Sequence, residues 1–319
     1  MGHHGLAVWL SFTGLVVALI VLDLGVLNRR SHVLSFKEAM SWSLGLIAFA
    51  LLFGLFLWWW EGAQHALEYY TGYLIELSLS VDNLFVFILI FNYFGVPSEA
   101  QPKVLKWGIL GAVVMRFIMI ALGGLLFARF EWIIYVFGGI LVLTGLRMLL
   151  QKEERIEPEK NPVVRLARRV LPFAESYDEA RFFCRTGTGR LLATPLLLVL
   201  LVVEWSDLVF AIDSIPAIFA ITRDPFLVYS SNVFAILGLR ALFFVLAGMM
   251  DKFAYLKPGV ALILVLVGAK MALSAWLHVP ILVSLAVILL MLGGAVGLSL
   301  WRTEKTEKTE RTERTEKFG

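Results

Sequence analysis

The sequence predicts an all-α polytopic membrane protein with about nine transmembrane helices. Of its 319 residues, 59% are hydrophobic and 17% are charged, whereas soluble domains carry about 25% charged residues. The apolar residues form runs long enough for membrane spans, which need about 20 residues each. Several acidic residues lie inside these runs rather than between them. The single cysteine, Cys184, excludes an internal disulfide framework.

Nine apolar runs are the expected spans. The first is longer than a signal-peptide core and has no small-residue cleavage site before Arg29 and Arg30, so we expect it to stay as a span. The runs are 6–27, 42–60, 70–95, 104–127, 131–150, 193–221, 226–249, 257–277 and 279–300.

Basic residues alternate across these runs in a way that predicts orientation. Cytoplasmic loops collect Lys and Arg, and here nearly all loop Lys and Arg fall on one side. The other side holds only Arg129 and Arg223. We therefore expect the amino terminus outside and the carboxyl terminus in the cytoplasm.

Between the fifth and sixth runs lies the one sizeable aqueous segment, which we interpret as a solvated cytoplasmic connector. The Thr-Glu-Lys and Thr-Glu-Arg triplets after residue 302 predict a mixed-charge tail with little structure or a frayed helix. The expected units are the first two spans (1–60), a three-span unit (61–150), the connector (151–192), a second three-span unit (193–278), the last span (279–301) and the tail (302–319).

The two three-span units resemble each other in sequence. Residues 76–83 and 207–214 each begin with an acid followed by Leu, and each places a second acid six residues later, before Asn or Ser. Two further matches follow in the same order: Arg116 with Gly124 against Arg240 with Gly248, and 141–148 against 264–271. A repeat of three spans must enter the membrane from opposite sides, so we expect an inverted repeat with a substrate site between its copies.

Ionisable side chains within these spans are costly, about 2.5–3.5 kcal/mol each near the bilayer centre. One interpretation is that these side chains form ion pairs that only lock helices together. Because the acids outnumber the arginines, pairing alone leaves an excess of acids, and a functional site is favoured. The acids are Glu76, Asp82, Glu204, Asp207 and Asp213, and the arginines are Arg116 and Arg240.

Their ligand chemistry suits a hard cation. Pro216 removes a backbone hydrogen bond, so we expect a break in the sixth span that frees carbonyl groups. Carboxylates, carbonyls and the side chains of Ser80, Asn83 and Ser214 form an all-oxygen set, which suits Mg²⁺, Ca²⁺ or Mn²⁺ alike. No histidine lies within a span, and there is no Walker-type nucleotide motif.

At these residues the sequence resembles the TerC family of integral membrane proteins. The resemblance covers about residues 6–300 and is carried by Glu76, the Ser-Val-Asp-Asn stretch 80–83 and the stretch 204–217; Asp23 fits the family's first span. The family is named for tellurium resistance, and several members are described as manganese exporters. The Mn²⁺ ligands that the resemblance implies are Glu76, Asp82, Asn83, Glu204, Asp207 and Asp213.

We therefore expect a secondary transporter in the plasma membrane of a bacterium (the inner membrane), which exports divalent cations, Mn²⁺ first among them, by alternating access. Proton coupling through the acids, no enzymatic activity and no tightly bound cofactor complete this expectation. Its expected contacts are the lipid bilayer and the cation, with no nucleic acid. The alternative is a membrane anchor of a tellurite-resistance or metal-stress complex, which would recruit soluble proteins at the cytoplasmic face.

Overall fold

The computed structural model describes residues 5–22, 35–130, 132–150, 161–185, 190–247, 255–274, 276 and 279–318. The predicted class, an all-α membrane protein, is confirmed: apart from one two-stranded hairpin, the regular elements in these ranges are helices. The elements are α1 (Leu6–Val21), α2 (Phe36–Glu61), α3 (Ala63–Phe94), α4 (Gln101–Arg129), α5 (Ile133–Leu150), α6 (Pro162–Val170), β1 (Phe183–Arg185), β2 (Leu191–Ala193), α7 (Pro195–Phe219), α8 (Pro225–Leu237), α9 (Leu239–Ala247), α10 (Leu256–Ala272) and α11 (Ile281–Phe318).

Among the described residues, six helices are long and apolar enough to cross a membrane, and the pair α8–α9 makes a seventh if it counts as one span. The remaining two expected spans coincide with α1 and α10, which are shorter, at 16 and 17 residues. Residues 23–27 of the first expected span, and 275 and 277 of the eighth, lie outside the described residues. The count of nine therefore stays a prediction.

Local sequence explains why α2 and α3 are longer than their apolar runs. Ser35 caps the start of α2 in a capping box with Glu38, so the helix begins in polar sequence before residue 42. The turn into α3 is the single residue Gly62, whose φ of +96° is accessible to glycine at little cost. As a result α3 includes Glu68, which precedes the expected span 70–95.

The seventh expected span is a bent pair. Asp224 caps α8 by accepting a hydrogen bond from the Phe226 amide, and Pro225 occupies the first turn. The axis then turns by 42° at Gly238, where α9 begins. Every residue from Phe226 to Leu237 is buried, which places α8 at the centre of the protein.

The expected break at Pro216 is not present. Helix α7 continues through Pro216 to Phe219, so the proline lies in its last turn. A proline has no amide proton, so it cannot donate the helical hydrogen bond at its own position, but in the last turn only a few residues follow it. The helix continues past it, and the Ala220 amide donates to the Pro216 carbonyl (3.0 Å). The carbonyl ligands that this break was expected to supply are therefore not freed by a broken helix.

The connector has more regular structure than expected, and the tail takes the helical one of its two expected forms. In the connector, α6 is followed by the antiparallel pair β1–β2, and the Tyr177 hydroxyl fixes the segment by donating to the Phe94 carbonyl at the end of α3 (2.8 Å). The tail continues α11 as a helix to Phe318. Its triplets place Glu304 four residues before Lys308 and Glu307 four before Arg311, an order that favours a helix.

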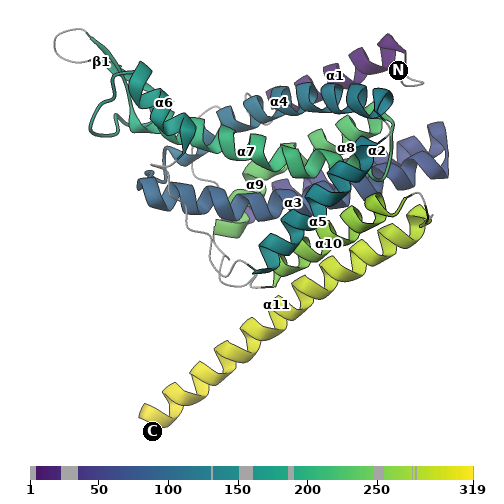
Figure 1. Cartoon of the computed structure of the whole chain (residues 1–319). Coiled ribbons are helices and arrows are strands. Elements are labelled where there is room, and N and C mark those ends of the chain that lie inside the picture. Colours follow the sequence, from purple (N-terminus) through teal and green to yellow (C-terminus); the bar gives the residue numbers. More distant parts are fainter. Residues whose placement is uncertain are drawn as a thin grey trace.

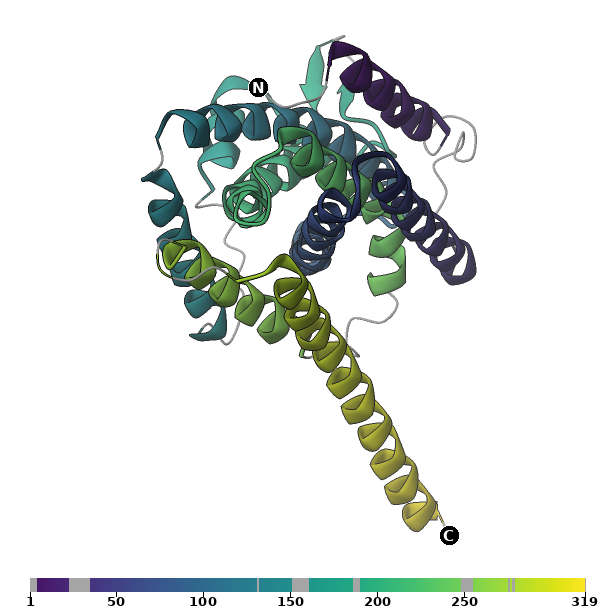
Figure 2. The same ribbon diagram turned by 90° about the vertical axis from the view of Figure 1, so that its right-hand side faces the viewer.

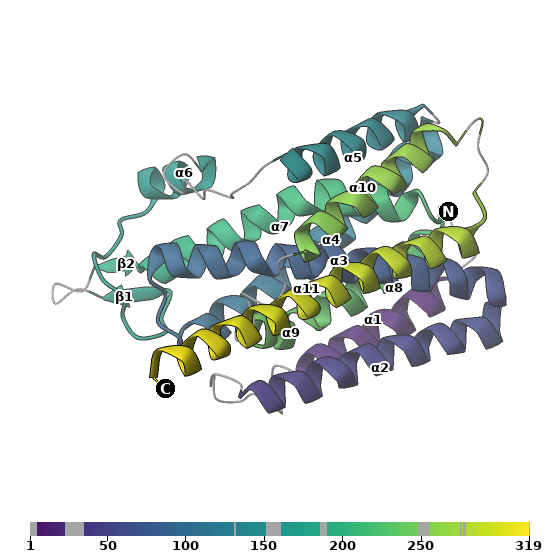
Figure 3. The ribbon, with the colours of Figure 1, turned by 90° about the horizontal axis from the view of Figure 1, so that it is seen from below.

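The helices form a bundle around α3, which packs against α2, α7 and α8 (Figure 1). Figure 2 shows α11 leaving the bundle toward the carboxyl terminus. In Figure 3, α6 and the β-hairpin lie at one end of the bundle, and α11 runs toward that same end. Helix α1 begins at the opposite end.

Candidate functional site

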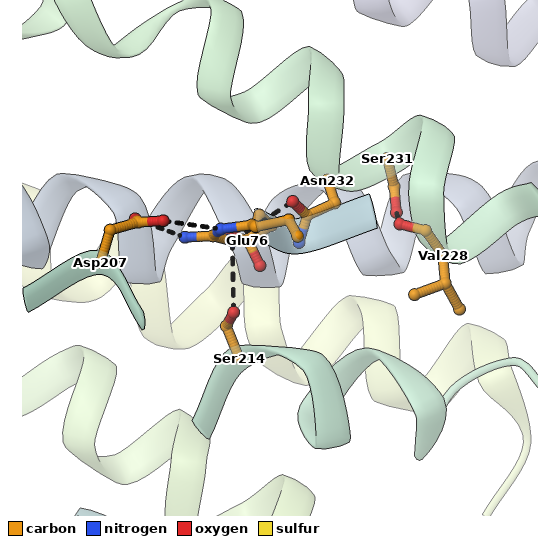
Figure 4. Close-up of polar contacts among 7 residues, drawn as sticks. Glu76, Asp207, Ser214, Val228, Ser231 and Asn232 are labelled. Atoms are coloured by element: carbon orange, nitrogen blue, oxygen red, sulfur yellow. Dashed lines mark hydrogen bonds and ion pairs between the residues drawn. The ribbon is translucent and has the colours of Figure 1, made fainter. Parts of the chain in front are cut away.

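A buried arginine joins four helices at the centre of the bundle. Arg116 of α4 has no exposed surface, and its guanidinium contacts the Glu76 carboxylate of α3 and the Asp207 carboxylate of α7 (Figure 4). Its Nη2 lies 3.0 Å from Asp207 Oδ1 and its Nε 3.4 Å from Oδ2. Nη1 also lies 3.3 Å from Ser214 Oγ of α7 and 3.3 Å from Asn232 Oδ1 of α8.

The charges of this cluster do not cancel. Arginine stays protonated in proteins, so with both carboxylates ionised the set of Glu76, Asp207 and Arg116 carries a net negative charge. Removing one partner from such a buried set costs about 3–5 kcal/mol, because a charge is left without compensation. Arg116 thus compensates only one of the two negative charges that ionised Glu76 and Asp207 would carry.

Some polar atoms beside the arginine remain unsatisfied. Within the described part of the chain, Glu76 Oε2, Ser80 Oγ and Asn232 Nδ2 have no hydrogen-bond partner, and all three side chains are fully buried. A buried polar group without a partner costs about 1–3 kcal/mol. Glu76 and Ser80 are four residues apart on α3, so they lie on one face of that helix.

Glu204 lies beside this cluster, on the face of α7 that meets α4. It is half-buried and, with Asp207, lines a small cavity together with Phe87, Gly108, Ala112 and Leu239. Gly111 makes this position possible, because a Cβ at that residue would overlap the Glu204 carboxylate. The missing side chain of Gly111 thus provides the space that the acid occupies.

Asp213 points elsewhere. Its Oδ1 accepts a hydrogen bond from the Thr144 hydroxyl of α5 at 3.1 Å, and the side chain is half-buried. Asp82 is likewise half-buried on α3, Asn83 beside it is buried, and Arg240 is buried on α9. Asp23 lies outside the described residues.

The structure thus brings together only part of the predicted site. Arg116 joins Glu76, Asp207 and Ser214 directly, and Glu204 is the next acid along the same face of α7. Among the residues that the structure describes, no three His, Cys, Asp or Glu side chains are grouped closely enough to hold a metal ion. The six implied ligands stay a prediction.

Sequence reasoning missed Asn232. It lies in the middle of the apolar run 226–249, and a polar side chain there is a recognised signal for a contact between helices. The sequence indicates Thr144 only as part of the matched segment 141–148 and does not indicate that its hydroxyl contacts Asp213.

These features define a polytopic helical membrane protein with a charged cluster enclosed by its spans. The chain belongs to the integral membrane protein TerC family, whose model matches residues 61–307. This confirms the family that the sequence resembles.

Several curated proteins are similar to the chain along most of their length. An uncharacterised membrane protein of Myxococcus xanthus is 51% identical over 95% of this chain and 94% of its own length. Proteins provisionally named membrane-bound redox modulator Alx are 47% identical in Escherichia coli strain K12 (88% of this chain, 90% of that protein) and 45% in Salmonella typhi (92% and 94%). No solved structure matches the chain.

Proposed function

We propose that this protein is a secondary transporter that exports divalent cations, Mn²⁺ first among them, across a bacterial inner membrane. The observation that supports this most directly is the position of Arg116 between Glu76 and Asp207. The two acids occupy matching positions in the two similar sequence units, and the arginine holds them together. In this proposal the positive side chain of Arg116 occupies the position at which the transported cation binds.

An inverted repeat is part of the proposal, and the contact between α5 and α10 supports it. The sequence match pairs Gly145 with Gly268, and the same offset pairs Gly138 with Ala261. A Cβ at Gly138 would lie 2.9 Å from the Gly268 carbonyl oxygen, and a Cβ at Gly145 would lie 2.6 Å from the Ala261 carbonyl oxygen. If each residue is replaced by its match in the other unit, the Gly138–Gly268 contact becomes the Ala261–Gly145 contact. A two-fold axis between the units requires such a pair of equivalent contacts.

The proposed topology has nine spans, with the amino terminus outside and the carboxyl terminus in the cytoplasm. An odd number of spans places the termini on opposite sides, and α1 begins at the end of the bundle opposite to the one toward which α11 runs (Figure 3). Connections with most of the loop Lys and Arg, including the segment with α6, would face the cytoplasm. We call the opposite end, which carries the α7–α8 connection, the outer face.

In the proposed cycle Arg116 competes with the cation for the two acids. The cation would approach along the cavity beside Glu204 and bind oxygen atoms of Glu76 and Asp207, while Arg116 moves aside. Release toward the outer face would return the acids to Arg116 or to protons. A carboxylate holds a metal or a proton but not both well, which would couple export to proton entry.

Oxygen ligands favour Mn²⁺, Mg²⁺ or Ca²⁺ over softer ions, and the choice of Mn²⁺ follows the family resemblance. No enzymatic step and no bound cofactor enter this proposal. The relatives' provisional name refers to redox modulation. With Cys184 as its single cysteine, this chain has no internal dithiol for such a role, so we propose that any redox effect follows from metal movement.

A membrane anchor for a resistance complex is the second candidate. The exposed arginines of α6 (Arg165, Arg168 and Arg169) offer a surface for a soluble protein. An anchor gives no reason to enclose Glu76, Arg116 and Asp207, so we favour transport.

Efflux from cells loaded with Mn²⁺ separates the two candidates. Asp82 and Asp213 are two of the six ligands that the family resemblance implies, and in this proposal they help to bind the cation during the cycle. We expect efflux with the wild type, and a large loss with Asp82→Asn and with Asp213→Asn at equal membrane levels. Full efflux with both variants contradicts the proposed role of these acids. Two results together favour the anchor. Wild-type cells show no Mn²⁺ efflux, and deletion of residues 161–185 abolishes resistance to tellurite or to metal stress.

A further inference from the structure

One acid near the outer face has no role in the site described above. Glu68 is half-buried in the second turn of α3, eight residues before Glu76. Residues 68, 72, 76 and 80 follow one another at intervals of four, so they lie along one face of the helix. Three of them are polar, Glu68, Glu76 and Ser80, and the fourth is Gly72. At 1.5 Å per residue, about 12 Å of helix separates the two glutamates.

Helix α7 and its C-terminal extension follow this face in the antiparallel direction. The Thr222 hydroxyl, just beyond α7, donates to Glu68 Oε2 at 2.6 Å. One turn deeper, a Cβ at Gly72 would lie 3.1 Å from Ile218 Cγ2. At the level of Glu76, Arg116 lies within hydrogen-bonding distance of Ser214. The two helices are therefore in contact from the outer face to the central cluster.

Helix α8 also packs against α3 at Gly72. A Cβ at Gly72 would also lie 3.1 Å from Ser231 Oγ, and the Ser231 hydroxyl donates its proton to the Val228 carbonyl at 3.1 Å. A hydroxyl oxygen that donates its proton still has two lone pairs, which can accept a hydrogen bond or contact a cation. Figure 4 shows Ser231 on the side of Asn232 away from Asp207.

We propose that Glu68 is the outer acid of a polar path through which the cation, or the proton that replaces it, passes between the Glu76–Asp207 pair and the outer face. Gly72 and Ser231 lie along the path. It is closed in the present conformation, because Ile218 Cγ2 and Ser231 Oγ would each lie 3.1 Å from a Cβ at Gly72. The proposal rests on the transport function proposed above. Glu76, at the inner end of the path, is fully buried, and its Oε2 has no hydrogen-bond partner among the described atoms.

The chemistry at Glu68 suits a transient cation contact. Its Oε1 accepts a hydrogen bond from Gln64 Nε2 at 3.0 Å and its Oε2 the one from Thr222, so the groups that hold it are neutral. Carboxylate, amide and hydroxyl oxygens are ligands for hard cations. The inner half of the molecule does not repeat this feature. The position that matches Glu68 in the second unit is Val199, which is buried.

The simpler explanation is that Glu68 only fastens the α7–α8 connection to α3, and two matched variants separate the explanations. Glu68→Gln keeps an oxygen that accepts the Thr222 hydrogen bond but removes the charge. Thr222→Val keeps the charge but removes this hydrogen bond, together with the one that the Thr222 hydroxyl accepts from the Asp224 amide. The full chain would be purified, reconstituted into liposomes, and assayed for the initial rate of Mn²⁺ movement.

A path through Glu68 predicts at least a tenfold lower rate for Glu68→Gln, a rate within twofold of wild type for Thr222→Val, and substantial activity for Glu68→Asp. The proposal is overturned if Glu68→Gln keeps the wild-type rate, or if Thr222→Val loses as much as Glu68→Gln. Asp207→Asn serves as the reference. An inactive wild type contradicts the transport function itself, whereas an active wild type with an inactive Asp207→Asn and a fully active Glu68→Gln contradicts only the path.

A labelling measurement covers the case in which Glu68→Gln does not fold. Cys184→Ser with Ser231→Cys provides a single thiol beside Gly72. We expect an impermeant thiol reagent added at the outer face to label it during Mn²⁺ turnover. A thiol that stays unlabelled during turnover, in protein that transports, overturns the path.

Discussion

Arg116 holds Asp207 with two nitrogen atoms, Nη2 at 3.0 Å from Oδ1 and Nε at 3.4 Å from Oδ2. A guanidinium matches a carboxylate in this paired geometry, and an ammonium group does not. The same guanidinium contacts Glu76 through Nη1. One side chain of α4 therefore links α3 and α7, the helices that carry the matching acids.

Replacing Arg116 with Met leaves two buried carboxylates without a cation. We expect the free energy of unfolding to fall by about 3–5 kcal/mol, measured as a lower thermal midpoint in detergent. Adding Glu76→Gln and Asp207→Asn to Arg116→Met removes the uncompensated charges and restores most of the loss. Equal midpoints for Arg116→Met and wild type would show that the ion pairs do not stabilise the fold.

Mn²⁺ also tests the competition between Arg116 and the cation. A ligand raises the thermal midpoint of the state it binds. We expect Mn²⁺ to stabilise Arg116→Met more than wild type, because the metal takes the place of the guanidinium. No stabilisation of Arg116→Met at millimolar Mn²⁺ would contradict a cation site at Glu76 and Asp207.

A methyl group at Gly111 would displace Glu204. Because a Cβ there overlaps the Glu204 carboxylate, we expect Gly111→Ala to move the acid and slow Mn²⁺ movement severalfold in protein that still folds. Gly45→Ala on α2 is the matched control, since a Cβ at Gly45 meets no atom within 4 Å. Unchanged transport in Gly111→Ala would remove Glu204 from the proposed entry route.

The contact between α5 and α10 depends on glycine at Gly138 and Gly268. A Cβ at Gly268 would lie 2.8 Å from the Gly138 carbonyl oxygen, so Gly268→Ala must separate the helix backbones. We expect a destabilisation of about 1–3 kcal/mol, measured by thermal unfolding. Gly139→Ala, where a Cβ meets nothing within 4 Å, should leave the midpoint unchanged, and equal effects of the two variants would contradict the contact.

Thr144 is expected to position Asp213. Thr144→Val keeps the shape of the side chain but removes the donor to Asp213 Oδ1, which should cost about 1 kcal/mol of stability and lower the transport rate. Thr144→Ser keeps the hydroxyl and should preserve both. If Thr144→Val transports at the wild-type rate, the orientation of Asp213 by this bond has no role in transport.

Hydropathy predicted the helices well because a bilayer requires every buried backbone group to be paired within its own helix. It failed where local sequence outweighed polarity. Ser35 extends α2 and Gly62 extends α3 beyond their apolar runs. Glu68 therefore lies in α3, although it precedes the third expected span. Pro216 was expected to break a helix, but its position in the last turn of α7 leaves little to break.

The candidate site was harder to predict because sequence spacing does not tell which helices meet. Glu76, Asp207 and Arg116 stood out as charges in apolar runs, and the structure joins them. Asn232 is neutral, and it belongs to the site because it is fully buried on α8 within hydrogen-bonding distance of Arg116. That position depends on how the helices pack, which the sequence does not give. Gly111 contributes only the space in which Glu204 lies.

The central claim is that a divalent cation crosses the membrane by binding at the acids that Arg116 holds. The most direct measurement is Mn²⁺ movement into proteoliposomes that contain a Mn²⁺-sensitive dye, for wild type and Asp207→Asn at equal reconstitution. We predict saturable Mn²⁺ movement with wild type, competition by other hard divalent cations, and a loss of at least tenfold with Asp207→Asn. Movement at the same rate in both proteins, or in neither, would contradict the account.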